Sequence, residues 1–402
     1  MLIDFWDVGS AHNSRRAMTT ADVSAHLAAD WLPSLPTSVS SALIGWPPFV
    51  LEGVHHNGQD LLCLRDSVGR SERQWKGVLS WMLGVAGTRH FLSLDGYQWI
   101  APLSAFYPEA KQTVDTSWHP AYPPGRLLAT RPTGSNARLR PDFVAVKPGS
   151  SSLEWAVVES KGTRSSLANQ PNCRTDWRQQ VWNVELRIDG VCVEIQRHLV
   201  VATRVNPSAK RPVARRIQVR AWNSNATAEG PNTPIEAIAE VATAHLFGLF
   251  LNLGMPANAK ALALARWRQI DGSSPDADPQ RTDIARLQEA AGEELKDRAG
   301  TTLSSSGESK GPTVVSLRWG AGISEVTLAA PLLNLVRGLQ SANEPAQLDS
   351  AISAADEQLA KWRTETPSVD DRETTSISLP FGITVRLPFS TLAEAEKTRG
   401  TE

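Results

Sequence analysis

The sequence predicts an α/β protein with a mixed sheet of the α+β kind. Two observations indicate this class: segments in which apolar residues recur at helical spacing, and shorter apolar runs that are bounded by Gly, Pro and Ser. The 402 residues, 41% of them hydrophobic, are enough for one large or two ordinary domains with real cores. The central part of the chain is expected to follow the order helix, three-stranded meander, helix, strand.

The first helix is expected at residues 71–85, where the apolar spacing is helical and Ser71 can cap the start. Pro and Gly then mark the turns between the strands of the meander. The other predicted elements of this part, in chain order, are strands at 90–94 and 97–101, a short helix at 108–118, the meander at 125–131, 139–146 and 153–162, a helix at 176–186, and strands at 198–205 and 216–222.

The chain divides into a first region of uncertain fold at 1–66, a central domain at 67–270, a linker at 271–280 rich in Pro, Gly, Ser and Asp, and an acidic α+β region at 281–402. The most apolar segment, 234–255, contains two Glu, one His and one Asn, so a half-buried helix is predicted there and not a membrane span. Further elements are expected as helices at 258–270, 281–298, 329–340 and 347–363 and strands at 313–319, 375–379 and 383–389.

Cysteine usage and the first residues of the chain favour a cytoplasmic location. Cys63, Cys173 and Cys192 are too few and too scattered for a disulfide framework or a CxxC zinc site, which fits a reducing compartment. The first residues are acidic where a secretory signal needs basic ones, and no apolar stretch of adequate length follows.

Charge is distributed unevenly along the chain. Residues 1–125 carry a net charge of -3, residues 126–220 of +10, and residues 221–402 of -8. The stretch 197–220 holds seven Arg or Lys and no acid. A block of this kind is typical of a polyanion-binding protein. The alternative is a basic face that only contacts water.

The densest group of chemically useful residues lies at 140–162, within the basic block. Asp142 begins one predicted strand, and Glu159 and Lys161 end the next. Side chains at i and i+2 of a strand share a face, so Glu159 and Lys161 point the same way while Ser160 faces opposite. A hairpin would bring the two carboxylates and the lysine together, whereas the plainer interpretation is a surface hairpin with charged ends.

Two carboxylates and a backbone carbonyl form an open, oxygen-rich shell that suits Mg²⁺. Such an ion polarises a phosphoryl oxygen and acidifies a bound water, and a lysine beside it can orient that water or offset developing charge. The hairpin therefore has the groups that phosphodiester hydrolysis needs.

The pattern RPD, sixteen residues, then ESK resembles the signature of the PD-(D/E)xK nuclease superfamily, which has a restriction-endonuclease-like fold. The resemblance extends to residues 70–222 through the order of elements. It implies that Asp142, Glu159 and the backbone carbonyl of Ser160 are ligands of Mg²⁺, with Mn²⁺ as a substitute. It also implies that Lys161 is the catalytic lysine.

Some members of that superfamily add a Glu from the first helix and a Gln from the helix after the third strand. Glu72 is the candidate for the first, with Glu109 as the alternative, and Gln180 or its neighbour Gln179 for the second. Val184 stands where one exonuclease subfamily has Tyr. Contacts to nucleic acid are expected from arginines around the site, with solvated charge as the alternative: Arg138, Arg140, Arg164, Arg174, Arg178, Arg215 and Arg216.

Together these observations predict a metal-dependent nuclease that cuts DNA, and the family analogy suggests a prokaryotic restriction or antiphage context. RNA is an alternative substrate. The rival hypothesis is a subunit with the nuclease fold that binds nucleic acid or a partner without cutting. A homodimer or a partner defence subunit would contact the C-terminal region, and no membrane is involved.

Overall fold

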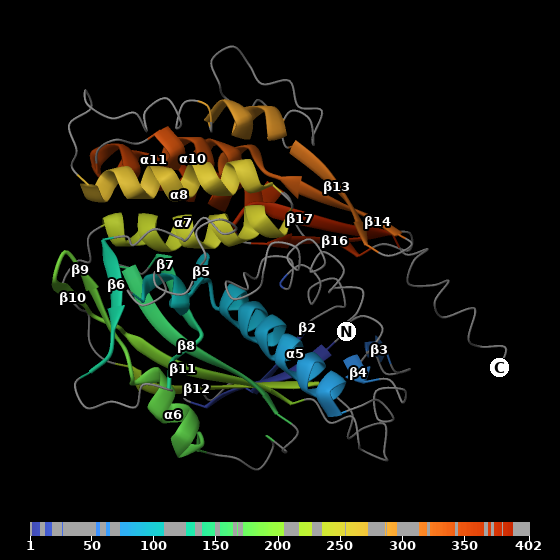
Figure 1. The fold of residues 1–402 in the computed structure, drawn as a ribbon. Coiled ribbons are helices and arrows are strands. Elements are labelled where there is room, and N and C mark those ends of the chain that lie inside the picture. Colours follow the sequence, from blue (N-terminus) through green and yellow to red (C-terminus); the bar gives the residue numbers. More distant parts are fainter. Residues whose placement is uncertain are drawn as a thin grey trace.

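A seven-stranded mixed sheet forms the centre of the molecule in the computed structural model of the chain (Figure 1). The structure describes residues 2–8, 13–17, 26, 54–56, 62–64, 73–107, 126–132, 139–148, 153–163, 167, 172–204, 217–226, 235–253, 255–271, 286, 288–295, 313–319, 322–341, 345–365, 369–370, 374–379 and 381–388.

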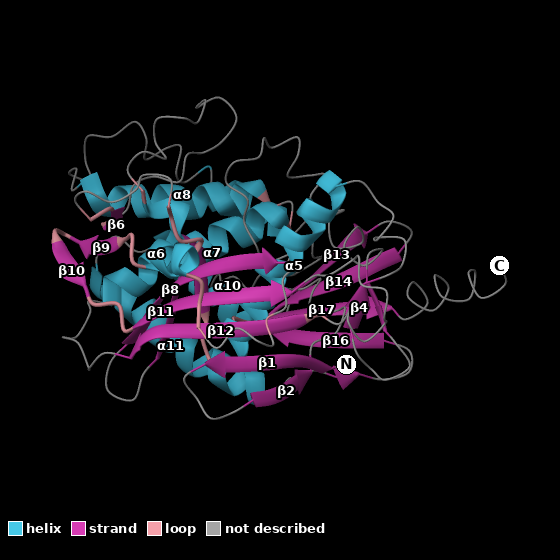
Figure 2. Cartoon of the chain, turned by 90° about the horizontal axis from the view of Figure 1, so that it is seen from below, coloured by secondary structure: helices cyan, strands magenta, loops and turns pink. Residues whose placement is uncertain are grey.

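The central sheet has the strand order β2-β1-β12-β11-β8-β7-β5, and Figure 2 shows strands β8, β11, β12, β1 and β2 lying side by side. β8 pairs antiparallel with β7 and parallel with β11, and β12 pairs parallel with β1. The strands are β1 (Leu2–Val8), β2 (Asn13–Ala17), β5 (Trp99–Pro102), β7 (Phe143–Pro148), β8 (Leu153–Thr163), β11 (Arg197–Arg204) and β12 (Gln218–Ala226).

Helices cover both faces of the central sheet. Along β8, Ala156 and Val158 pack on the face that α5 (Arg73–Leu94) covers, while Trp155 and Val157 belong to the opposite face. That opposite face carries α6 (Thr175–Val181) and α7 (Ile235–Asn252). Strands buried on both faces are apolar nearly throughout, which explains the continuous apolar runs of the sequence.

Small residues let α5 approach the sheet very closely. A Cβ on Gly84 would lie 2.8 Å from the backbone nitrogen of Gly162, and a Cβ on Gly162 would overlap the Ser80 carbonyl. The helix backbone therefore touches the strand at the residue that follows Lys161. Only glycine permits this contact, because any side chain at position 162 would displace the helix.

A second layer packs on α7, which lies between the central sheet and the C-terminal elements (Figure 1). One hydrophobic cluster runs without interruption from Trp99 of β5 through Phe247 and Phe250 of α7 to Leu332 and Phe381. The helices of this layer are α8 (Pro256–Asp271), α10 (Ala330–Ser341) and α11 (Pro345–Glu365).

An antiparallel five-stranded sheet completes the C-terminal region, with the order β13-β14-β17-β16-β15. Its strands are β13 (Thr313–Trp319), β14 (Gly322–Leu328), β15 (Val369–Asp370), β16 (Thr374–Leu379) and β17 (Ile383–Pro388). Residues 286 and 288–295 are helical. None of the helices within the described ranges is both long and apolar enough to cross a membrane.

Two small sheets lie beside these layers. β6 (Leu127–Thr130), β9 (Glu185–Ile188) and β10 (Val191–Val193) form one, and β3 (Val54–His56) with β4 (Leu62–Leu64) forms the other. A short 3-10 helix, η1 (Leu103–Phe106), follows β5.

The predicted meander is wrong in its first strand. Residues 125–131 contain β6, which pairs with β9 outside the central sheet, and β5 pairs with β7 in the place expected for it. The apolar pattern of both segments suits a strand, and only the tertiary pairing distinguishes them. The segment expected to be helical at 176–186 contains both α6 and the first residues of β9.

The strand expected at 90–94 is also wrong, because α5 continues to Leu94. Residues 82–92 of this helix are buried on all sides, so they lack the polar stripe that identifies a surface helix. The helix ends where Gly96 adopts a φ of +90° and Tyr97 donates a backbone hydrogen bond to the Leu92 carbonyl at 2.9 Å.

Other predicted elements are confirmed: the first helix, the strands at 139–146, 153–162, 198–205 and 216–222, the helices at 234–255 and 258–270, and most of the C-terminal elements. β1 and β2, in the region given as uncertain, belong to the central sheet. The helix expected at 108–118 and nearly all of the linker at 271–280 lie outside the described residues.

Candidate active site

The ends of β7 and β8 place Asp142 directly opposite Glu159. Phe143 pairs with Val158 in the antiparallel ladder, so the next pair along the strands is Asp142 with Glu159. The backbone nitrogen of Asp142 donates to the Val158 carbonyl at 3.0 Å, which extends the pairing past the end of the strand. Asp142 is exposed, whereas Glu159 is only 1% exposed.

Backbone groups fix the position of Asp142. Its carbonyl accepts a hydrogen bond from the Leu103 nitrogen at 2.8 Å, and its Oδ2 accepts one from the Ser160 nitrogen at 2.8 Å. A hydrogen bond between the Asp142 carboxylate and the backbone of the neighbouring strand holds that carboxylate beside Glu159.

Glu159 and Lys161 share a face of β8, as alternation predicts, and form an ion pair between Glu159 Oε1 and Lys161 Nζ. Burial and the neighbouring Asp142 carboxylate raise the pKa of Glu159 to about 8, although Lys161 opposes the shift. Glu159 Oε2 is buried and has no hydrogen-bond partner among the described residues. One oxygen of a buried acid is thus left for a further ligand.

Ser160 lies on the opposite face, also as predicted. Its Oγ accepts a hydrogen bond from Thr88 Oγ1 of α5 at 3.0 Å. This bond and the backbone contact at Gly162 fasten one face of the end of β8 to α5.

α6 holds the segment that precedes Asp142. Gln180 Nε2 donates to the Arg140 carbonyl at 3.4 Å, and Asn183 Nδ2 donates to the Leu139 carbonyl. Gln180 is therefore close to the site, as the sequence predicted, but its amide contacts backbone. Asn183 was not predicted. The predicted helix at 176–186 placed Asn183 inside a helix, whereas α6 ends at Val181, so no sequence signal identified this residue.

The structure describes three of the arginines that are expected to bind nucleic acid. Arg140 stacks over Tyr107, with its Cζ 4.8 Å from the ring centroid. Arg174 packs over Trp177 in the same way at 4.8 Å and pairs with Asp176 at 2.8 Å, while Arg178 is exposed on α6. Other predicted site residues lie outside the described part of the chain: Glu72, Glu109, Arg138, Arg164, Arg215 and Arg216.

A pocket of about 430 Å³ opens at the end of β8. Asp142 and residues 160–162 at the end of β8 form one side of the pocket, and the first part of α5 forms the other. Lining residues are Lys76, Gly77, Ser80, Trp81, Asp142, Ser160, Lys161 and Gly162. Lys76 and Trp81 were not among the predicted site residues. Helical spacing shows that residues 71–85 form a helix, but it does not show which strand that helix packs against.

Comparison of the chain with protein-family models, curated proteins and solved structures finds no match.

The two carboxylates at the ends of β7 and β8 fit a divalent cation that takes oxygen ligands. Within the described ranges no group of three or more His, Cys, Asp and Glu side chains is assembled for a metal. Two adjacent carboxylates are present, however, and one of them has an unpartnered oxygen and a raised pKa. A cation would offset the repulsion between Asp142 and Glu159, and Mg²⁺ commonly binds through one or two carboxylates while keeping several waters.

Proposed function

We propose that the protein is a Mg²⁺-dependent nuclease that hydrolyses phosphodiester bonds of DNA. The observation that carries the proposal is the buried Glu159 carboxylate, which lies opposite Asp142, is paired with Lys161, and has one oxygen without a partner. A buried acid with an unsatisfied oxygen is costly for stability, and such costs are typical of functional sites.

The arrangement of elements supports the same proposal. α5, β5, β7, β8, α6 and β11 occur in the chain in the order helix, three strands, helix and strand, with η1 and β6 inserted before β7, and β9 and β10 inserted before β11. The four strands are neighbours in the order β5-β7-β8-β11. The resemblance to the PD-(D/E)xK superfamily implies this succession, with β5 in place of the strand first expected at 125–131.

In the proposed reaction Asp142 and Glu159, with the Ser160 carbonyl, would hold Mg²⁺, for which Mn²⁺ would substitute. The ion, when bound, polarises a phosphoryl oxygen and acidifies a water. Lys161 Nζ lies on the Glu159 face and provides positive charge where negative charge develops on the phosphate. Gln180 and Asn183 position the segment that carries Asp142.

Long-range electrostatics favour a polyanionic substrate. Asp142, Glu159 and Lys161 belong to the segment 126–220, which carries a net charge of +10, whereas the two flanking segments are acidic. Such a field attracts phosphate backbones and makes binding dependent on salt. The prokaryotic restriction or antiphage context follows from the resemblance and is part of the proposal.

Cleavage of DNA by purified variants tests the proposal. Asp142→Asn, Glu159→Gln and Lys161→Met should each lower Mg²⁺-dependent cleavage of linear DNA by at least about a hundredfold, since removal of one group that stabilises developing charge costs about 10² to 10³ in rate. RNA of the same sequence is tested in parallel.

Matched controls are Glu185→Gln and Lys260→Met, because Glu185 lies on β9 away from the pocket and Lys260 is exposed on α8. Both should cleave like the wild type. Full activity in Lys161→Met, or equal activity in all five variants, would contradict the proposal.

A further inference from the structure

Two side chains of α5 contribute to the pocket at the end of β8. Lys76 and Trp81 line the same pocket as Asp142 and Lys161. Trp81 is 43% exposed, more than most of the large hydrophobic side chains in the described part of the chain. An indole of this size buries much apolar surface when it is part of a core, so its exposed part offers an apolar face to a ligand in the pocket.

The position of Trp81 is fixed by the packing of α5. Ser80, the preceding residue, meets Gly162 backbone to backbone, and Gly84 in the next turn meets the same glycine. The helix can neither approach the strand further nor move away without losing this contact. This contact fixes where the Trp81 backbone lies relative to the end of β8.

Several of the residues that line the pocket are small. A Cβ on Gly77 would have no atom within 4 Å, so the space beside this turn of the helix is open. Gly77, Ser80 and Gly162 line the same pocket as Trp81 and Asp142. The volume of about 430 Å³ lies within the range of small-ligand pockets.

An aromatic wall, a lysine and a proposed phosphodiester site in one pocket match a base, a flanking phosphate and the phosphodiester that is cut. Aromatic side chains stack on bases, lysines contact phosphates, and every base offers a π-face to such a wall. In an intact duplex the base faces are stacked on their neighbours and are inaccessible. A base can reach Trp81 only when it is unpaired or turned out of the helix.

We propose that this pocket is a nucleotide subsite in which Trp81 stacks on an unpaired base next to the phosphodiester at Asp142, and Lys76 contacts a flanking phosphate. The proposal rests on the proposed nuclease function and gives it a substrate class: single-stranded or locally unpaired nucleic acid is bound in preference to intact duplex.

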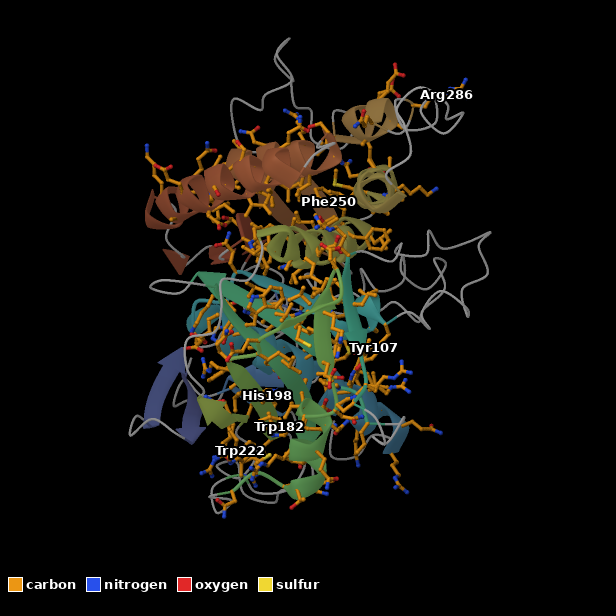
Figure 3. The ribbon with its side chains drawn as sticks, turned by 90° about the vertical axis from the view of Figure 1, so that its left-hand side faces the viewer. Tyr107, Trp182, His198, Trp222, Phe250 and Arg286 are labelled. Carbon is orange, nitrogen blue, oxygen red and sulfur yellow. The ribbon has the colours of Figure 1, made fainter. Side chains whose placement is uncertain are left out.

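Trp182 provides a matched control, since it is nearly as exposed, at 39%. One face of its ring is already covered, because it stacks on His198 with centroids 3.9 Å apart and planes 10° apart (Figure 3). It belongs to the C-terminal end of α6 and does not line the pocket. Loss of Trp182 removes an exposed indole without removing the proposed stacking wall.

The test is binding of a fluorescein-labelled 20-nucleotide DNA, single-stranded or annealed to its complement, to the full chain with Asp142→Asn in the presence of EDTA, so that nothing is cut. Fluorescence anisotropy should show that adding Trp81→Ala weakens single-strand binding roughly tenfold and duplex binding less than about twofold. Trp81→Phe should restore most of the loss, and Trp182→Ala should change neither. Lys76→Met should lower the salt dependence by about one unit of slope.

An equal loss on both forms of DNA, or no loss in Trp81→Ala, would overturn the subsite. Cleavage by the wild-type chain in Mg²⁺ is measured separately. A wild type that binds through Trp81 but cuts neither form would contradict the nuclease function. A wild type that cuts both forms with no dependence on Trp81 would contradict the subsite alone.

Discussion

At the scale of single residues, Glu159 is the point where stability and proposed function conflict. Its pKa is raised to about 8 by burial and by Asp142, whereas an unfolded-chain Glu has a pKa of about 4.3. At a pH between about 4.3 and 8, the Glu159 carboxyl is protonated in the folded state and ionised in the unfolded state. The stability contributed by the protonated carboxyl is fully present below about pH 4 and is lost as the pH rises through about 8.

Glu159→Gln should therefore stabilise the metal-free protein while abolishing cleavage, because a neutral amide replaces a buried charge. Its melting temperature should exceed that of the wild type at pH 8.5, and the difference should shrink toward pH 5. Each kcal/mol corresponds to roughly 2 to 4 °C in a protein of this size or somewhat smaller.

Thermal unfolding in EDTA at several pH values measures this difference. Glu185→Gln is the control, since the Glu185 side chain is 42% exposed, and it should show no such gain. A melting temperature lower than that of the wild type at pH 8.5 would mean that the ion pair with Lys161 is structural.

Part of the candidate site could be predicted from single residues. Strand alternation and one antiparallel turn were sufficient to bring Asp142, Glu159 and Lys161 together and to place Ser160 on the other face, because both rules are local. Lys76 and Trp81 could not be found in this way. Their place in the pocket depends on where α5 crosses β8, some eighty residues later in the chain, and no local pattern encodes that crossing.

At the scale of elements, the contact between α5 and β8 determines the geometry of the pocket. Gly162 lies against the Ser80 carbonyl, so any side chain there must displace the helix backbone. The pairing of β5 with β7, which the sequence did not predict, illustrates the same point. Apolar segments show that strands exist, but the partner of each strand is chosen by burial against helices that lie elsewhere in the sequence.

Gly162→Ala should destabilise the protein by about 1 to 3 kcal/mol, the usual cost of overpacking, and should lower cleavage because Lys161 and Ser160 move with the strand. Gly77→Ala is the matched comparison in α5. Its Cβ would meet open space, and alanine in a helix is favoured over glycine by up to about 1 kcal/mol. Urea denaturation measures both. Equal stability of the two variants would mean that α5 is not in close contact with β8.

At the scale of the whole molecule, α7 joins the proposed nuclease part to the C-terminal region. The Ile100 nitrogen of β5 donates to His245 Nδ1 of α7 at 3.2 Å, and the His245 ring contacts Phe381, which precedes β17, with centroids 4.4 Å apart. Gln98 Nε2 donates to Asp356 Oδ1 of α11 at 2.9 Å. The sequence predicts a linker at 271–280 between the central domain and the acidic C-terminal region. The contacts between these parts come from segments far apart in the chain, and composition cannot reveal them.

Phe381→Ala tests whether this continuous core unfolds as one unit. Phe381 is 1% exposed, and truncation of a buried Phe costs about 3 to 5 kcal/mol. If the core is one unit, the variant should melt in a single transition at lower temperature, and exchange of the Ile100 amide hydrogen should accelerate by the factor that the lost stability predicts. Two transitions, with exchange in β5 unchanged, would instead support two independent domains. We expect the single transition. The His245 ring accepts the Ile100 hydrogen bond and packs directly on Phe381. A cavity at position 381 therefore loosens β5 and the surface of α7 together.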